Sequence, residues 1–294
     1  MGPGPDARLL ADQKERLGLR VSVCLPARNE AATVGGIVAV VHGTLADRVG
    51  LVDEVVVLDD GSEDETGTVA AAGGARVCRE ADVLPELPPG TGKGNALWKA
   101  LFVSGGDLIC FLDADVRNFA PHFVTGLLEP LLRDPTIGFV KGHYERPLHG
   151  DPRGGGRVTE LVARPLLRAL FPALAGIRQP LSGEYAARRE VLEVLPFVEG
   201  WGVELGLLVD VADRFGVGAI TEADLGVREH RNRALGELAP QALAVLLTGL
   251  RRAGVAPVDV SGLPDADAPP PVRERPPMIS VPAYRAKFGR ELSA

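Results

Sequence analysis

Apolar and polar positions alternate in a regular way along the first half of the chain. Short apolar runs, bounded by polar or glycine-rich stretches, predict strands at 20–26, 54–58, 75–78 and 107–112. Longer stretches between these runs predict helices at 31–48, 64–72 and 93–104. Strands that alternate with helices predict an α/β protein with a mostly parallel, Rossmann-like sheet flanked by helices.

The second half of the chain is less regular. Its pattern predicts strands at 137–142 and 218–221, and helices at 157–170, 184–195, 203–215 and 239–252. Pro165 is expected to kink or split the first of these helices. Loops are predicted at 146–156 and 225–233. From 255 the chain is dense in proline and aspartate, which predicts a mobile tail with a helix at 283–292. The predicted organisation is an N-terminal extension at 1–19, two halves at 20–143 and 144–254, and a partly disordered tail at 255–294.

Composition narrows the class of protein. The chain has 294 residues, of which 46% are hydrophobic, enough for one large domain or one domain with a subdomain. A formal net charge of −7 argues against nucleic acid as a partner. No apolar stretch is long enough to span a bilayer, and the polar N-terminus does not resemble a signal peptide. Cys24, Cys78 and Cys110 lie in apolar runs and are expected to be reduced core residues rather than disulfide or zinc ligands. We therefore expect a cytoplasmic protein without a membrane partner.

Polar clusters follow three of the predicted strands, at 26–30, 59–62 and 113–115. Ligands bind at the carboxyl ends of parallel strands, so these clusters should face one crevice. Asp113 and Asp115 could converge on Mg²⁺ or Mn²⁺ that is bound to a diphosphate, because both ions prefer oxygen ligands. Alternatively, one aspartate caps the following helix and the other is solvated.

The first two clusters could hold a nucleoside. The backbone at 26–29 could grip a planar base, with Glu30 reaching a ribose hydroxyl, or the segment could be an ordinary turn in which Asn29 caps a helix. One of Asp59 and Asp60 could accept a hydrogen bond from N3–H of a uracil. Alternatively, this segment is an acidic turn with Ser62 or Asp64 as the helix cap.

Two glycine-rich segments enter predicted helices, at 88–100 and 153–165. Free backbone N–H groups at a helix start favour anions, so Lys93 in the first segment and Arg157 and Thr159 in the second suggest two anion sites. The alternatives are a flexible loop with a solvated lysine and a purely structural glycine turn.

Two further side chains carry weaker signals. His230, in the basic cluster 228–233, could bind a metal ion as neutral imidazole or could simply be solvated. Glu204, on an otherwise apolar helix face, could hydrogen-bond sugar hydroxyls or pair with an arginine.

Taken together and in order, these segments resemble the GT-A glycosyltransferases, and more closely the glucosyl-3-phosphoglycerate synthases, from 21 to about 252. The resemblance rests on LPARNE, VLDDGSEDET, GKGNALW, FLDADV, GGGRVTELVARPLL, QPLSGEYAARR, WGVELGLL and LGVREHRNR. The aspartate pair is shared by many transferases, whereas GGGRVTELVARP and HRNR are much narrower motifs.

The resemblance implies a GT-A fold whose C-terminal subdomain, 144–254, binds the acceptor, and whose half 20–143 binds a nucleotide sugar. It implies retaining transfer of glucose from UDP-glucose, or a related nucleotide sugar, to D-3-phosphoglycerate, with Mg²⁺ or Mn²⁺ as cofactor. A homodimer is expected on separate grounds, as the commonest assembly of soluble oligomers. The implied donor-binding residues are Pro26, Ala27, Asn29, Glu30, Asp59, Asp60, Lys93, Asp113, Leu181 and Ser182. The implied acceptor-binding residues are Gly156, Arg157, Thr159 and Asn232. Asp115 and His230 are the implied metal ligands, and Asp115, Glu204 and Arg157 the implied catalytic residues.

Two departures from the family pattern leave the identity of the sugar and of the acceptor open. Trp201 stands where the resemblance predicts a tyrosine, and the loop between Tyr144 and Gly154 is short. The alternatives are a related transferase with another sugar or acceptor, such as mannosyl transfer to a phosphoglycerate, a sugar-1-phosphate nucleotidyltransferase, and a non-catalytic nucleotide-sugar sensor. A nucleotidyltransferase would release pyrophosphate, whereas a sensor would bind without forming product.

Overall fold

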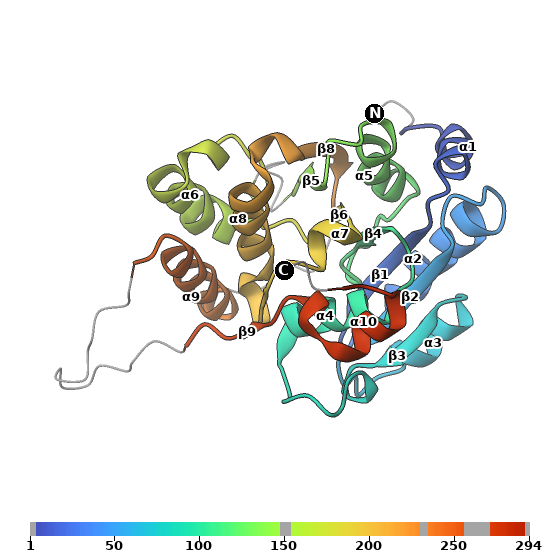
Figure 1. Cartoon of the computed structure of the whole chain (residues 1–294), viewed down its shortest axis with the longest axis horizontal. Coiled ribbons are helices and arrows are strands. Elements are labelled where there is room, and N and C mark those ends of the chain that lie inside the picture. The colour runs from blue at the N-terminus through green and yellow to red at the C-terminus, as the bar shows by residue number, and fades with distance from the viewer. Residues whose placement is uncertain (1–3, 148–153, 230–234, 256–270, 292–294) are drawn as a thin grey trace.

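A seven-stranded sheet forms the centre of the computed structural model, which describes residues 4–147, 154–229, 235–255 and 271–291 (Figure 1). The strand order is β3-β2-β1-β4-β6-β5-β8. The strands are β1 (Val21–Ala27), β2 (Glu54–Asp59), β3 (Arg76–Arg79), β4 (Leu108–Phe111), β5 (Phe139–Glu145), β6 (Tyr185–Arg188) and β8 (Ile220–Val227). β6 runs antiparallel to β4 and β5, whereas the other pairings in this sheet are parallel. The predicted mostly parallel α/β sheet is therefore confirmed.

Helices flank this sheet. They are α1 (Ala7–Leu17), α2 (Val34–Val40), α3 (Thr66–Ala72), α4 (Gly92–Val103), α5 (His122–Arg133), α6 (Arg164–Leu170), α7 (Arg189–Leu192), α8 (Val203–Phe215), α9 (Leu235–Arg252) and α10 (Pro282–Phe288). In Figure 1, α6, α8 and α9 lie together on one side of the molecule, away from α1, α2 and α3. None of the helices in the described ranges is both long and apolar enough to cross a bilayer.

Two hydrophobic cores, one on each face of the sheet, follow from the alternation of side chains along the strands. On β2, Val55 and Val57 belong to the core beneath α1, α2 and α5, whereas Val56 and Leu58 belong to the core beneath α4 and α8. The strands are therefore apolar on both faces, which explains why they read as continuous apolar runs in the sequence.

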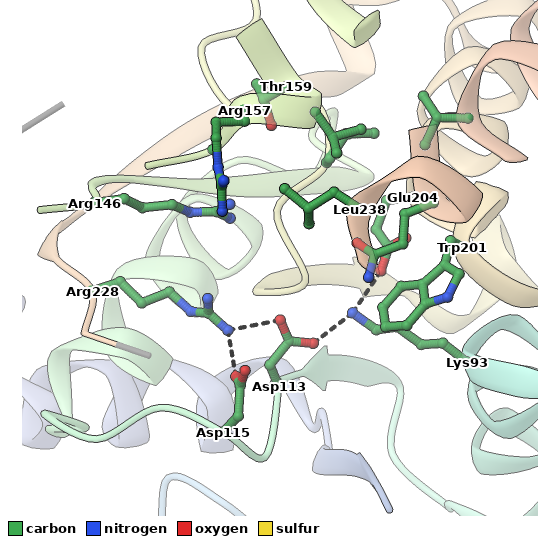
Figure 2. Close-up of a pocket in the computed structure, with 15 residues that line it drawn as sticks. Lys93, Asp113, Asp115, Arg146, Arg157, Thr159, Trp201, Glu204, Arg228 and Leu238 are labelled. Atoms are coloured by element: carbon green, nitrogen blue, oxygen red, sulfur yellow. Dashed lines mark hydrogen bonds and ion pairs between the residues drawn. The ribbon is translucent and has the colours of Figure 1, made fainter. Parts of the chain in front are cut away.

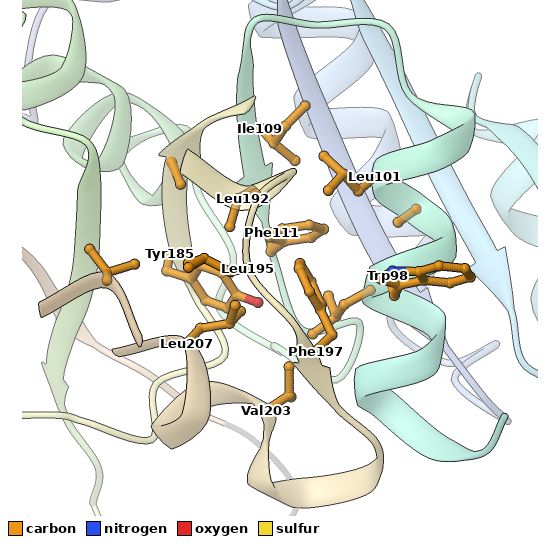
Figure 3. Close-up of a cluster of buried hydrophobic side chains, with 14 of the residues drawn as sticks. Trp98, Leu101, Ile109, Phe111, Tyr185, Leu192, Leu195, Phe197, Val203 and Leu207 are labelled. Atoms are coloured by element: carbon orange, nitrogen blue, oxygen red, sulfur yellow. The ribbon is translucent and has the colours of Figure 1, made fainter. Parts of the chain in front are cut away.

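The second of these cores joins the two halves of the chain (Figure 3). Trp98 of α4, Phe111 of β4 and Tyr185 of β6 are all buried there, and the ring centroids of Phe111 and Tyr185 lie 5.1 Å apart. Aromatic pairs at this separation add to the stabilisation that burial of their surface provides. This packing fixes β6, and the turn that precedes it, against the strand that carries Asp113 and Asp115.

Residues 271–291, expected to belong to a mobile tail, pack on this same core. β9 (Glu274–Arg275) pairs with β7 (Phe197–Val198), and the Trp98 indole donates a hydrogen bond to the Pro276 carbonyl at 2.8 Å. Tyr284 of α10 is buried and donates to Glu193 Oε2 at 2.6 Å. The mobile-tail prediction is wrong for these residues because buried Met278, Val281 and Tyr284, spaced three apart, anchor them.

Other predicted elements also need correction. The helix predicted at 184–195 is wrong over Tyr185–Arg188, where pairing with β4 and β5 makes an alanine-rich segment the strand β6. β8 is longer than the predicted strand at 218–221 and takes in the start of the predicted loop. The helix predicted at 157–170 is split, with π-helical turns at Thr159–Ala163 and α-helix from Arg164, where Pro165 occupies the first turn. α1 and α5 have no counterpart among the predicted helices.

The predicted division between 143 and 144 stays a prediction. β5 spans that position, and β6 and β8 extend the same sheet.

Candidate active site

The carboxyl ends of β1, β2 and β4 open into a cavity of about 510 Å³. Its walls are Pro26, Ala27, Arg28, Asn29, Glu30, Asp60, Gly92, Lys93, Ala96, Asp113, Ala114, Asp115 and Trp201. The three strand-end clusters therefore meet in one crevice, as their positions in a parallel sheet require.

Hydrogen bonds tie the turn after β1 to the turn after β2. Asn29 adopts a left-handed backbone conformation with φ 57°, and its Oδ1 accepts from the Glu63 amide at 2.8 Å. Its own amide donates to Ser62 Oγ at 3.0 Å. Asn29 therefore connects the two turns instead of capping a helix.

The adjacent aspartates of the second turn have different surroundings. Asp59 Oδ1 accepts from the Ser62 amide at 2.9 Å and holds the turn, whereas Asp60 lines the cavity. Burial, followed by the nearby Glu80 carboxylate, raises the pKa of Asp60. Asp60 is therefore the member of the pair placed to meet a ligand.

Two cations hold the Asp113–Asp115 pair (Figure 2). Lys93 Nζ lies 2.5 Å from Asp113 Oδ1, and Arg228 Nη2 lies 2.8 Å from both Asp113 Oδ2 and Asp115 Oδ1. Burial alone would raise the pKa of Asp113, but Lys93 and Arg228 hold that pKa well below its usual range. These ion pairs explain how two carboxylates can stand at the end of a buried strand.

Lys93 also pairs with the predicted sugar-binding carboxylate. Its Nζ forms an ion pair with Glu204 Oε1 at 2.6 Å. Although burial lowers the pKa of Lys93, the carboxylates of Asp113 and Glu204 raise it well above its ordinary value. Lys93 is therefore a fixed positive charge between the strand end and α8.

A buried carboxylate anchors Arg228 from behind. Glu184 is 0% exposed, and its Oε1 accepts from Arg228 Nε at 2.8 Å while its Oε2 accepts from the Tyr144 hydroxyl at 2.7 Å. Arg146 Nη2 donates to the same hydroxyl at 2.7 Å. Because Arg228 is only 3% exposed, Glu184 fixes the geometry with which it meets the aspartates.

A second, smaller cavity of about 150 Å³ adjoins the first and shares Lys93, Asp113, Asp115 and Trp201 with it. Its other walls are Arg146, Gly156, Arg157, Val158, Thr159, Leu181, Glu204, Arg228, Leu238, Gln241 and Val245. Figure 2 shows Arg146 and Arg157 pointing into the space above Arg228. Three guanidinium groups around one small cavity favour a ligand that carries negative charge.

Comparison with known proteins shows to which family of proteins a chain with these two cavities belongs. Residues 22–195 match the family model of Glycosyl transferase family 2. A glucosyl-3-phosphoglycerate synthase from Petrotoga mobilis is 42% identical over 96% of this chain and 93% of that protein. One from Mycolicibacterium smegmatis is 51% identical over 82% of this chain and 80% of that protein. This chain belongs to the glucosyl-3-phosphoglycerate synthase family.

Solved structures of the family share the fold. A glucosyl-3-phosphoglycerate synthase from Mycobacterium tuberculosis in complex with Mn²⁺, UDP-glucose and phosphoglyceric acid has a TM-score of 0.82 and 47% identity, covering 95% of this chain and 96% of that one. The same enzyme with Mg²⁺ and UDP has a TM-score of 0.83 and 46% identity, over 94% and 96%. The family resemblance and the GT-A fold inferred from the motifs are confirmed.

The donor set at the aspartate pair fits the divalent cation that the family uses. Asp115 borders both cavities, and its ion pair with Arg228 involves Oδ1, which leaves Oδ2 to face a cation. Within the described ranges, no three His, Cys, Asp or Glu side chains gather as a metal site. Asp115 therefore fits as one protein ligand beside the oxygens of a bound diphosphate. His230, the second predicted ligand, and the predicted acceptor-binding Asn232 lie outside the described residues.

Three side chains of the smaller cavity that carry a guanidinium or an amide group were not predicted as site residues: Arg146, Arg228 and Gln241. The strand order contains a signal for the first two. β5 and β8 are parallel to β4, so their carboxyl ends reach the same edge, and Arg146 and Arg228 are the residues that directly follow them. Gln241 comes from α9, and no pattern in the sequence points to it.

Proposed function

We propose that this chain transfers glucose from UDP-glucose to D-3-phosphoglycerate with retention of configuration, releasing UDP and forming glucosyl-3-phosphoglycerate. The observation that carries the proposal is the junction of the two cavities at Asp113, Asp115, Lys93 and Trp201. A nucleotide in the larger cavity and an anion in the smaller one would meet there. The Mycobacterium tuberculosis relative that binds UDP-glucose and phosphoglyceric acid supports this choice of substrates.

On the donor side, Pro26 and Ala27 line the larger cavity and would grip a planar base, whose N3–H Asp60 would accept. Asn29 and Glu30 line the same cavity and would contact the ribose. Asp59 supports this surface from behind by holding the turn after β2, whereas buried Ser182 lies in the turn at 179–183 and would act at the sugar end.

At the reacting end, Lys93 would lie beside the diphosphate, and Asp113 would lie nearer the ribose. A divalent cation held by Asp115 supplies Lewis-acid stabilisation to the departing diphosphate. Glu204 accepts hydrogen bonds from sugar hydroxyls, and its ion pair with Lys93 makes it a poor nucleophile. This pairing favours attack from the side of the leaving group over a covalent glycosyl–carboxylate route.

On the acceptor side, Arg157 and Thr159 lie in the first turn after Gly156, which adopts φ 75°. Backbone N–H groups at this helix start and the Arg157 guanidinium would bind the acceptor's phosphate or carboxylate. Arg146 adds a second guanidinium from the end of β5. Asn232 and His230 remain predictions from the family motif.

Two further proposals concern the protein as a whole: it is cytoplasmic, and it assembles as a homodimer. Light scattering coupled to size exclusion would test the assembly, with twice the 31.0 kDa chain mass expected. A monomer at assay concentration would contradict it.

The activity itself is tested with purified protein, Mn²⁺ and a panel of nucleotide sugars against small phosphorylated acids. We expect UDP release only when UDP-glucose and 3-phosphoglycerate are both present, with a product mass equal to the acceptor plus one hexose. Pyrophosphate release would indicate a nucleotidyltransferase. Binding without product for every pair would indicate a sensor, and faster transfer from GDP-mannose would indicate a mannosyltransferase.

A further inference from the structure

A fully buried lysine lies beneath the junction of the two cavities and has no role in the mechanism above. Lys141, on β5, is 0% exposed. Its Nζ lies 4.8 Å from the ring centroid of Tyr185 and 6.0 Å from that of Phe139. In the part of the chain that the structure describes, no carboxylate oxygen lies within 4.0 Å of this nitrogen, in contrast to Lys93 and Lys14. Burial of such a group without an ion-pair partner costs free energy, and among the described residues its ammonium group makes one hydrogen bond.

That hydrogen bond goes to the backbone. Lys141 Nζ donates to the Ser182 carbonyl at 2.6 Å. Ser182 closes a turn through its amide, which donates to the Gln179 carbonyl at 3.0 Å. The residue before it, Leu181, lines the smaller cavity, and the residue after it, Gly183, packs directly on the Asp113 carboxylate. The lysine therefore holds the peptide between a cavity wall and the aspartate pair.

The geometry points to Lys141 as a positioning residue for glucosyl transfer, which holds the Ser182 carbonyl so that Leu181 and Gly183 fix the sugar-binding end of the donor site. This inference rests on the proposed function, because it assigns the turn at 179–183 to the sugar. It concerns the sugar end of the donor alone, since the uridine end is built from the turns after β1 and β2.

The electrostatic surroundings agree with a role at the site. Burial is the largest cause that lowers the pKa of Lys141 to about 7. Of four charged groups on the surrounding elements, the three carboxylates raise this pKa and the one lysine lowers it. These groups are Glu204 of α8, Lys93 of α4, Glu184 before β6 and Asp113 after β4. The amine and the ammonium can both donate to the Ser182 carbonyl, but the charged form makes the stronger hydrogen bond. The contribution of Lys141 should therefore be larger at pH 6 than at pH 8.

The test compares Lys141→Met with Lys14→Met, a matched change of a second buried lysine. Lys14 donates to the Gly50 carbonyl at 2.7 Å and pairs with Asp53, far from both cavities. We expect Lys141→Met to lower kcat/KM by about tenfold, the scale of one charge-assisted hydrogen bond, without lowering Tm at pH 7. Lys14→Met should lower Tm and leave kcat/KM within about twofold of wild type.

Binding measurements separate this inference from the proposed function. By calorimetry with Mn²⁺, Lys141→Met should bind UDP like wild type and bind UDP-glucose about tenfold more weakly. If wild type binds UDP-glucose and forms no product with any acceptor, the proposed function fails and the binding comparison still decides the role of Lys141. Lys141→Gln, which keeps an N–H donor, should recover at least about threefold of the loss, and it replaces the methionine variant if that one does not fold.

Three results would overturn the inference. The first is a Lys141→Met protein with kcat/KM within about twofold of wild type at both pH 6 and pH 8. The second is equal weakening of UDP and UDP-glucose binding. The third is a fall in Tm that matches that of Lys14→Met, which would make Lys141 a purely structural residue.

Discussion

Replacing Gly183 by alanine should greatly slow transfer. A Cβ built on Gly183 would meet both carboxylate oxygens of Asp113 about 1 Å inside ordinary van der Waals contact at 3.4 Å. The backbone of Gly183 does not adopt a positive φ, so alanine adds no conformational strain. The effect of the substitution is therefore steric and acts on one carboxylate.

The displaced group has little freedom to move. Asp113 is held at 2.5 Å by Lys93 and at 2.8 Å by Arg228, so a shift of about 1 Å breaks or lengthens both ion pairs. A misplacement of about 1 Å in a reacting centre costs about 100-fold in rate, equivalent to about 2.7 kcal/mol. We expect a fall of that size in kcat/KM for UDP-glucose.

The assay is the initial rate of UDP release with Mn²⁺ and saturating 3-phosphoglycerate, together with Tm for each protein. Gly176→Ala is the control, because a Cβ on Gly176 meets nothing within 4 Å. It should retain wild-type activity. If Gly183→Ala keeps kcat/KM within about threefold of wild type, Asp113 does not need its observed position and the geometric argument is refuted.

Three other predictions concern the charges around the aspartate pair. Lys93→Met leaves buried Glu204 without its cation and removes one of the two cations of partly exposed Asp113, so its free energy of unfolding should fall by about 3 kcal/mol at pH 7 in urea titrations. In wild type the lowered pKa of Asp113 stabilises the fold above the unfolded pKa of this group, and that stabilisation is lost as the pH falls in acid; because Lys93 is the largest cause of the lowering, Lys93→Met should lose less stability on acidification than wild type, and a variant that follows the wild-type pH profile would contradict this. Glu184→Gln weakens the anchor of buried Arg228 and should lower the free energy of unfolding by about 2 kcal/mol or more, so an unchanged denaturation midpoint would show that Glu184 is dispensable. Asp115→Ala should abolish transfer and Mn²⁺ binding measured by electron paramagnetic resonance, and near-normal turnover with Mg²⁺ would remove Asp115 from the metal site.

Local patterns predicted which turns meet in the larger cavity, because these turns follow strands that are themselves easy to recognise. The turns after β1, β2 and β4 carry Asn29, Asp60 and Asp113, and a parallel sheet brings such turns to one edge whatever the details of packing. The spacing of these residues did not assign roles to them, and the expected roles came from the resemblance to the family motifs.

The smaller cavity, and the residues that hold the aspartate pair in place, depend on contacts between distant parts of the chain. Arg228 reaches Asp113 across 115 residues, and Glu184 reaches Arg228 across 44. These pairs exist because β6 enters the sheet antiparallel between β4 and β5, in a segment whose alanines favour helix locally. Because pairing with β4 and β5, and not its own composition, makes this segment a strand, the sequence did not predict the partners of Arg228.

The most direct test of the account is nuclear magnetic resonance of the product formed from UDP-glucose, 3-phosphoglycerate and Mn²⁺, recorded after the paramagnetic ion is removed. The account predicts an α-linked glucosyl-3-phosphoglycerate, formed in equal amount to UDP, because the donor is α-linked and the configuration is retained. A β-linked product, or UDP formed with free glucose and no glycoside, would contradict it.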